Sequence, residues 1–239
     1  NSMKENTPPG RELHEVEVFV TLDEPVTKTV NQDNKTLWVD GDKISVIGTE
    51  YGEEEYIANY LTYRGNNTFG GRISYPGDDN NWYFAYPYRE DNVTPQETHI
   101  TVDQEQTQIG NDNMEHIAGE GFPLIGKVLA LPRADQISVH MTNVLARLDY
   151  VINNTLETPI VVKQVVFTAP QKIGGNFVGD MTKDNISWTA ESGSYHSVTL
   201  NVEDGEEIAA EGQAAFHAGI LATTINAGES MKIKIVAVD

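Results

Sequence analysis

The stretch Leu-Trp-Val-Asp-Gly-Asp-Lys-Ile-Ser-Val-Ile, residues 37–47, decides the fold class. Asp-Gly between aromatic and β-branched runs is a strong hairpin signal, and a type I′ turn requires positive φ at both central residues. The stretch therefore predicts two short strands that turn at Asp40 and Gly41. Trp38 and Lys43 would share the outer face of this hairpin, where the lysine stem can lie on the indole ring. The core face would hold Leu37, Ile44 and Val46.

Outward from this hairpin, the chain shows the same two-residue periodicity. Residues 12–22 alternate cleanly, which is typical of a strand buried on one side, and residues 1–11 read as a flexible polar leader. The apolar face of the alternating strand consists of Val16, Val18, Val20 and Leu22. Further strands are expected at residues 26–30, 56–63, 68–75, 82–88, 99–102, 136–140, 146–153, 160–168, 186–189, 197–202, 220–225 and 231–238. Only residues 206–216 could be helical, and Gly212 in their middle disfavours a helix.

Many short strands separated by turn residues predict an all-β protein, built as a sandwich or a barrel. We expect two Greek-key β-sandwich domains in tandem, with their junction at residues 131–135. The N-terminal domain would span residues 1–132 and carry the first strand. The C-terminal domain would span residues 133–239 and be either truncated or a compact variant.

Several short motifs follow one another along the chain. They are Trp38-x-x-Gly41-Asp42-Lys43-Ile44-x-Val46 after Thr27-Lys28-Thr29, then Tyr86-Pro87-Tyr88, Phe122-Pro123-Leu124-Ile125 and Asn143-Val144-Leu145-Ala146-Arg147-Leu148. In this order they resemble the fimbrillin family, the lipoprotein-derived pilins of Bacteroides-type bacteria, including the minor-fimbrium-like group. The resemblance implies two transthyretin-like sandwiches.

The resemblance also implies a mechanism of assembly. In fimbrillins a trypsin-like protease cuts behind the first strand, the strand is lost, and a strand of another subunit fills the groove by β-augmentation. The removable plug would present Val16, Val18, Val20 and Leu22. Lys28 matches the position of the cleavable basic residue, although a lysine does not suit an arginine-specific protease and an ordinary loop lysine is an equal reading. The candidate donor strand presents Met231, Ile233, Ile235 and Ala237, a pattern that also suits an ordinary edge strand.

The resemblance therefore implies a structural and adhesive pilus subunit at the cell surface, derived from an outer-membrane lipoprotein. Its partners would be other pilin subunits, a trypsin-like processing protease and a host or bacterial surface receptor. A mature lipoprotein begins with a lipidated cysteine, and the chain contains no cysteine. We therefore expect either the soluble part of such a protein or a different family.

The composition excludes several classes of function. A formal net charge of −20 opposes binding to nucleic acid and to anionic lipid. The lack of cysteine rules out disulfides, thiolate catalysis and cysteine–metal sites. No apolar run is long enough to span a membrane as a helix.

No motif indicates catalysis or a cofactor. The six histidines stand singly, without the spacing of a zinc site, and no nucleophile elbow, P-loop or dinucleotide fingerprint occurs. The 36 acidic residues contain many pairs, so sequence cannot select the two carboxylates that a glycosidase needs. We expect neither catalytic nor cofactor-binding residues. Loop aspartates that could bind calcium are Asp33, Asp40, Asp42, Asp78 and Asp79.

An aromatic stripe provides an alternative function. Trp82, Phe84, Tyr86 and Tyr88 lie on one face of an alternating segment. The stripe could stack on sugars, which would make the protein a surface carbohydrate-binding lipoprotein, or it could pack a sandwich core. We favour the core, and we rank a hydrolase behind both binding functions.

Overall fold

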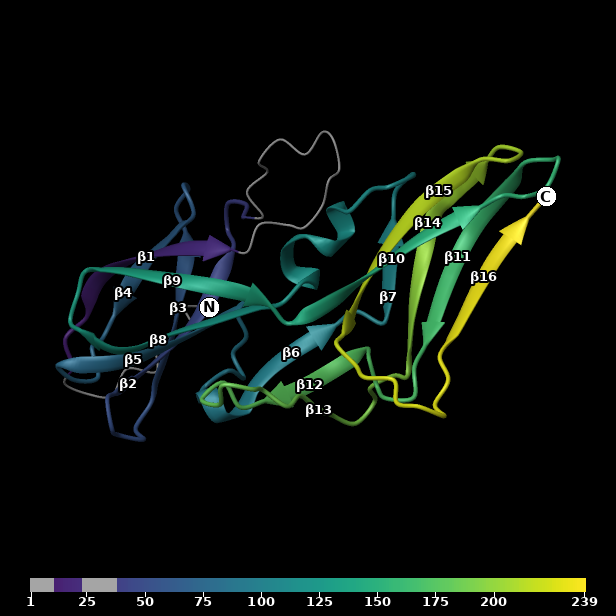
Figure 1. Ribbon diagram of the computed structural model, residues 1–239. Coiled ribbons are helices and arrows are strands. Elements are labelled where there is room, and N and C mark those ends of the chain that lie inside the picture. The colour runs from purple at the N-terminus through teal and green to yellow at the C-terminus, as the bar shows by residue number, and fades with distance from the viewer. Residues whose placement is uncertain (1–10, 23–37) are drawn as a thin grey trace. The chain divides into compact units, whose positions relative to one another are not determined.

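The computed structural model describes residues 11–22 and 38–239, so the predicted strand at 26–30 and most of the leader lie outside the described residues. The described chain is all-β, as predicted, with three short 3-10 helices (Figure 1). The elements are β1 (His14–Leu22), β2 (Lys43–Glu50), β3 (Ile57–Tyr63), β4 (Thr68–Ile73), β5 (Asp79–Tyr86), η1 (Pro95–Glu97), β6 (Thr98–Val102), β7 (Glu105–Gln108), η2 (Glu115–Ile117), η3 (Gly119–Gly121), β8 (Leu124–Pro132), β9 (Gln136–Asn143), β10 (Leu145–Asn153), β11 (Ile160–Thr168), β12 (Gly175–Gly179), β13 (Thr189–Ala190), β14 (Ser197–Ile208), β15 (Gln213–Leu221) and β16 (Lys232–Val238).

The chain divides into two compact units that interleave along the sequence. Unit 1 comprises residues 1–99, 123–143 and 178–189, and unit 2 comprises residues 100–122, 144–177 and 190–239. The junction expected at residues 131–135 lies in the turn between β8 and β9. Because both of these strands belong to the sheet of unit 1, the compact units do not separate at that turn.

In unit 1 a single sheet closes on itself, in the order β1-β4-β3-β2-β5-β8-β9. All neighbours are antiparallel except β1 and β9, which run parallel. The sheet wraps around one apolar core that includes the predicted core residues Ile44 and Val46. We expected a two-sheet sandwich here. The observed sheet is instead continuous, because β1 joins its two ends.

The turn at Asp40-Gly41 is present, but its type and the side chains around it differ from the prediction. Gly41 has a φ of +94°, whereas Asp40 is not among the residues with positive φ, so the turn is not type I′. The Asp42 amide donates to the Val39 carbonyl (3.1 Å), and the Val39 amide donates to Asp42 Oδ2 (2.8 Å). Asp42 therefore stabilises the turn from the inside.

Trp38 was predicted on the outer face, and this prediction was wrong. Its side chain is buried in the core and meets the rings of Phe69 and Tyr86 edge-on, at 4.9 and 4.8 Å. The ammonium of Lys43 lies over the ring of Tyr60 instead, 4.7 Å from its centre. The reason is that residues 38 and 39 form no ladder with β2, so strand alternation does not fix where Trp38 points.

In unit 2, two sheets face each other across a second core. One sheet has only two strands, β10 and β15, and the other has four, in the order β16-β11-β14-β7. Both sheets contribute to the core, with Phe216 and Ile220 on β15 and Val165 and Leu200 on the larger sheet. The remaining sheet of the described chain is three-stranded, in the order β13-β12-β6.

The segment 206–216 forms the hairpin between β14 and β15, so its helical reading was wrong. The turn uses Glu211 at a φ of +59°, and the Gly212 amide donates to the Ala209 carbonyl (2.9 Å). Alanine favours a helix locally. Here the pairing of β15 with β10 outweighs that preference, because it buries Ala214 and Phe216 in the core.

Candidate functional site

The first strand closes the sheet of unit 1. β1 pairs with β4 in antiparallel register, with Val18 opposite Phe69, and with β9 in parallel register, with Val18 opposite Ile137. Figure 1 shows β1 in purple beside β9. The strand is N-terminal, yet both of its edges are hydrogen-bonded. Its removal would leave β4 and β9 as two unpaired edges on either side of a gap.

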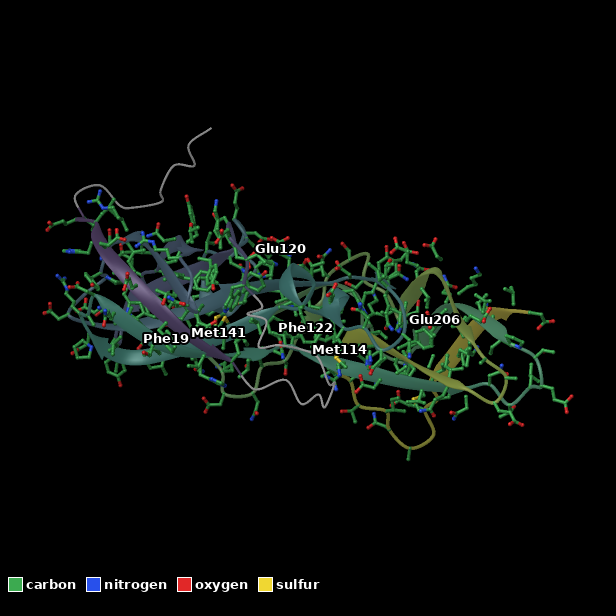
Figure 2. The ribbon with its side chains drawn as sticks, turned by 90° about the horizontal axis from the view of Figure 1, so that it is seen from above. Phe19, Met114, Glu120, Phe122, Met141 and Glu206 are labelled. Carbon is green, nitrogen blue, oxygen red and sulfur yellow. The ribbon has the colours of Figure 1, made fainter. Side chains whose placement is uncertain are left out.

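The apolar face of β1 is buried, as predicted. Val16 and Val18 have no exposed surface, Val20 is 1% exposed, and Leu22 is half-buried against the same core. Phe19 points the other way and is 45% exposed, whereas Met141 on β9 is fully buried (Figure 2). The side chains that the resemblance assigns to a plug therefore occupy the core.

Polar contacts hold β1 on its outer face and beyond its ends. Arg11 was expected in a flexible leader, but its guanidinium donates to the carbonyls of Tyr75 (3.3 Å) and Pro76 (2.8 Å). Glu15 accepts a hydrogen bond from Arg64, and the Thr21 hydroxyl lies 2.9 Å from His140 Nδ1. These contacts are exposed or half-buried and contribute little compared with the valines.

Burial makes β1 hard to release. Fully burying a valine contributes roughly 1.5–3 kcal/mol, so three valines contribute roughly 5–9 kcal/mol, which is an upper estimate. A whole domain is stable by about 5–15 kcal/mol. Cutting the chain behind β1 would therefore leave the strand in place, held non-covalently. A competing strand or a denaturant would be needed to remove it.

The other predicted site residues are only partly described. Lys28, the candidate processing residue, lies outside the described residues. Three of the four candidate donor residues, Ile233, Ile235 and Ala237, lie on β16, and Met231 precedes it. All four are exposed, and β16 pairs with β11 alone among the described strands. The structure thus places the candidate donor in an edge strand of unit 2.

The aromatic stripe lies mainly inside unit 1. Trp82, Phe84 and Tyr86 are at most 3% exposed and belong to the core of the closed sheet. Tyr88 is half-buried and lies against Tyr60, with ring centres 5.1 Å apart. The prediction that the stripe packs the core is confirmed. The carbohydrate-binding alternative required these aromatic rings to be exposed, and three of the four are buried.

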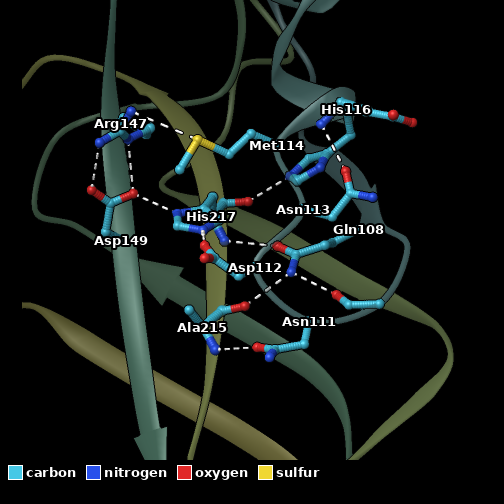
Figure 3. A network of polar contacts seen from close by, with 12 residues as sticks. Gln108, Asn111, Asp112, Asn113, Met114, His116, Arg147, Asp149, Ala215 and His217 are labelled. Carbon is cyan, nitrogen blue, oxygen red and sulfur yellow. Dashed lines mark hydrogen bonds and ion pairs between the residues drawn. The ribbon is translucent and has the colours of Figure 1, made fainter. Parts of the chain in front are cut away.

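Sequence reasoning missed a polar network in unit 2 (Figure 3). His217 on β15 is 4% exposed; its Nδ1 lies 2.6 Å from Asp149 Oδ1 on β10, and its Nε2 lies 2.7 Å from Asp112 Oδ1. Arg147 forms a two-point pair with Asp149, at 2.8 and 2.9 Å. Gln108 accepts a hydrogen bond from the His217 amide at 2.9 Å. The network thus fixes the segment after β7 onto β15.

This network does not resemble a catalytic centre. A general base needs a ring nitrogen with a free lone pair within reach of a substrate proton. Both nitrogens of His217 face carboxylate oxygens, so neither is free. Burial alone would raise the pKa of Asp149, but hydrogen bonds from Arg147 and His217 outweigh it and lower that pKa. The arrangement is that of a structural clamp.

His116 should make the stability of unit 2 depend on pH. Burial lowers its pKa below the ordinary 6.5, and Nδ1 is buried without a partner among the described residues, while Nε2 lies 2.6 Å from the His217 carbonyl. The unfolded chain therefore binds the proton more readily. We expect the free energy of unfolding to fall as pH drops from 6.5 toward the lowered pKa. Chemical unfolding of wild type and His116→Gln between pH 7 and 5 tests this. An equal slope in both proteins would contradict it.

Asp33, one of the candidate calcium ligands, lies outside the described residues, and the other four form no metal site within them. Asp42 is buried in the turn, and Asp78 pairs with Arg133 at 3.8 Å. Within residues 11–22 and 38–239, no group of three or more histidine, aspartate or glutamate side chains could hold a metal ion. Over the same residues, no helix has the length and apolar character needed to cross a membrane.

Comparison with known proteins finds similarity in structure and not in sequence. No protein-family model and no curated protein matches the chain. Two crystal structures, of proteins provisionally named as cell adhesion proteins, align over most of their length. The protein from Bacteroides uniformis has a TM-score of 0.55 at 14% identity, covering 98% of this chain and 86% of the other. The protein from Bacteroides ovatus has a TM-score of 0.53 at 14% identity, covering 95% and 86%.

A tip fimbrial protein from Porphyromonas gingivalis also aligns, at 12% identity with a TM-score of 0.45, over 94% of this chain and 81% of the other. That looser likeness does not by itself establish a shared fold. The two Bacteroides structures do, and they come from the bacterial group whose fimbrillins the sequence motifs resemble. The chain thus shares its fold with these two Bacteroides proteins, which are provisionally named as cell adhesion proteins.

Proposed function

We propose that the protein is a structural and adhesive subunit of a surface fimbria. The observation that carries this proposal is the position of β1, an N-terminal strand that closes a sheet and fills its core with three valines. The fold shared with Bacteroides proteins named for cell adhesion supports it. In this proposal the protein binds other subunits and a host or bacterial surface receptor, and it is not an enzyme.

Assembly would proceed by strand exchange. A trypsin-like protease cuts after Lys28, and a strand of another subunit then displaces β1. The displacing strand gains the hydrogen bonds of both β4 and β9, and its alternate side chains enter the core. Because the gap has two free edges, an unfilled groove would aggregate, so release of β1 and entry of the donor must be coupled.

The donor that we propose is the C-terminal strand. In a parallel replacement of β1, its residues align with the buried face four to four: Met231 with Val16, Ile233 with Val18, Ile235 with Val20 and Ala237 with Leu22. This register places Ser230 at the position of Glu15. The acceptor's Arg64 would then lose its carboxylate partner. A one-residue shift would turn the lysines of the donor into the core, so the register is strongly fixed.

The remaining parts of the proposal follow from the family resemblance. The precursor would be an outer-membrane lipoprotein, and the mature subunit would lie outside the cell, in the pilus. Unit 2, with its two facing sheets, would correspond to one transthyretin-like Greek-key sandwich of the family, and unit 1 would be the domain closed by its plug.

Limited trypsin digestion tests the processing step. We expect the first cut after Lys28, with the body of the protein intact. Because burial holds β1, the N-terminal fragment should stay bound in native gel filtration and separate only in urea. Mass spectrometry of both fractions identifies the cut. Lys28→Gln is the variant, and Lys183→Gln, an exposed lysine of unit 1, is the matched control.

Subsequent incubation of the nicked protein tests the assembly step. Nicked wild type should form a ladder of oligomers on a denaturing gel without boiling, whereas uncut protein and the Lys28→Gln variant should not. Recovery of residues 12–35 in one uncut piece after the body has been degraded would contradict the processing step. Complete cutting after Lys28 without oligomers would contradict exchange between identical subunits.

A further inference from the structure

The last strand leaves an unprotected sheet edge in unit 2. Among the described strands, β16 pairs with β11 only, and Figure 1 shows it in yellow at the margin of the four-stranded sheet. The edge of β15, in contrast, is protected, because side chains of β7 form hydrogen bonds with its backbone. Gln106 accepts from the Gly219 amide (2.8 Å) and donates to the Gly219 carbonyl (2.7 Å). Among the described residues, no side-chain hydrogen bond of this kind covers the backbone of β16.

The edge strand also continues the core face beyond the area that the smaller sheet covers. Ile233 pairs with Phe167 and Ile235 pairs with Val165, so each isoleucine points to the same side as its buried partner. Phe167 and Val165 are at most 4% exposed, whereas Ile233 and Ile235 are 48% and 47% exposed. Two large apolar side chains thus lie on the core side without cover, as at sites where another chain binds.

The other face of the same strand is positively charged. Lys232 and Lys234 alternate with the isoleucines and are exposed, in a chain whose net charge is −20. Lysines on an edge strand ordinarily prevent pairing with a second edge. A partner strand with carboxylates on the same face would pair favourably with these lysines, because opposite charges in cross-strand pairs stabilise a sheet. The lysines would therefore select an acidic strand over other strands.

Among the described strands, β1 has a pattern that matches this edge. β1 reads Glu15-Val16-Glu17-Val18, and the edge reads Lys232-Ile233-Lys234-Ile235. Both alternate with a period of two, so a parallel alignment places each glutamate beside a lysine and each valine beside an isoleucine. An antiparallel alignment places both glutamates beside the lysines and Val16 beside Ile233. In unit 1, the valines of β1 are buried on one face and its glutamates are exposed on the other.

We propose that the free edge of β16 binds the first strand of a second copy of the chain. This inference rests on the proposed function in one respect, because the cut after Lys28 and strand exchange would supply the free strand. The docked strand extends the four-stranded sheet, shields Ile233 and Ile235 along one side and pairs its carboxylates with the two lysines. A subunit whose own β16 has not been donated to a neighbour keeps this edge, and a released first strand would bind there as a cap.

A binding experiment on the full chain tests the docking edge without any proteolysis. The probe is a fluorescein-labelled peptide of residues 12–22, and the readout is fluorescence polarisation. We expect saturable binding to the wild type. The Lys232→Glu/Lys234→Glu variant should bind roughly ten-fold more weakly, because two attractive cross-strand pairs become repulsive. The Lys172→Glu/Lys183→Glu variant has the same net charge and should bind like the wild type.

A charge swap separates docking on β16 from entry into the sheet of unit 1. A peptide with Glu15→Lys and Glu17→Lys should bind the Lys232→Glu/Lys234→Glu variant more tightly than it binds the wild type. Wild-type peptide that displaces the resident β1 would be insensitive to Lys232 and Lys234. Binding unaffected by the double variant, or no saturable binding, would overturn the inference. A protein that binds the peptide but resists cutting after Lys28 would instead count against the proposed function alone.

Discussion

Val18→Asp should largely unfold the closed sheet of unit 1. Val18 has no exposed surface and lies between Phe69 on β4 and Ile137 on β9, so a carboxylate there would have neither water nor a partner. An uncompensated buried charge costs about 3–5 kcal/mol, a large share of the roughly 5–15 kcal/mol that stabilises a domain. Phe19→Asp is the matched control. It lies next in sequence on the outer face, 45% exposed, and should change stability by less than about 1 kcal/mol.

Urea unfolding followed by tryptophan fluorescence measures this effect in the correct unit, because all three tryptophans, at positions 38, 82 and 188, fall within unit 1. The variant should also lose β1 readily after cutting, since the strand would no longer be held by burial. Equal urea midpoints for the two aspartate variants would show that β1 does not contribute to the core as described. That result would remove the basis of the proposed plug.

The position of β1 shows how far sequence periodicity reaches. Alternation over residues 12–22 correctly predicted a strand buried through Val16, Val18 and Val20, because a period of two is a local property. It could not show that β4 and β9 are the partners of β1. The residues of β4 and β9 that pair with β1 lie about 50 and 120 positions further along the chain. These two pairings alone decide that the sheet closes.

Local signals misled where tertiary contacts outweighed them. The Asp40-Gly41 turn was predicted correctly, but Trp38 turned inward because no ladder fixes its side. The alanines around Gly212 favoured a helix, yet Ala214 and Ala215 pair with β10 in the smaller sheet of unit 2. In each case the sequence carries the local preference, and the partner that overrides it lies far along the chain.

The clamp around His217 had no local signal of any kind. Its two carboxylates lie 68 and 105 residues away in sequence, and each stands among many other acidic residues. Isolated histidines and abundant aspartates are expected in any chain of this composition. Asp149 and His217 come together only through the pairing of β10 with β15, which places them opposite each other.

His217→Ala should loosen unit 2 while leaving unit 1 intact. The substitution removes two charge-assisted contacts, at 2.6 and 2.7 Å, and leaves Asp112 and Asp149 close together without the ring between them. Hydrogen bonds to charged groups contribute about 1.5–3 kcal/mol, and both carboxylates are partly exposed, so we expect a loss of about 2–3 kcal/mol in total. His196→Ala, an exposed histidine of the same unit, is the control.

Hydrogen exchange is the appropriate measurement, since unit 2 contains no tryptophan. The amides of β10 and β15 should exchange faster in His217→Ala, and those of β2 and β5 should not change. A double-mutant cycle with Asp112→Asn then separates the clamp from simple packing, because residues in one network are not additive. Additive effects of the two substitutions would mean that His217 stabilises unit 2 through its volume and not through the bridge between Asp112 and Asp149.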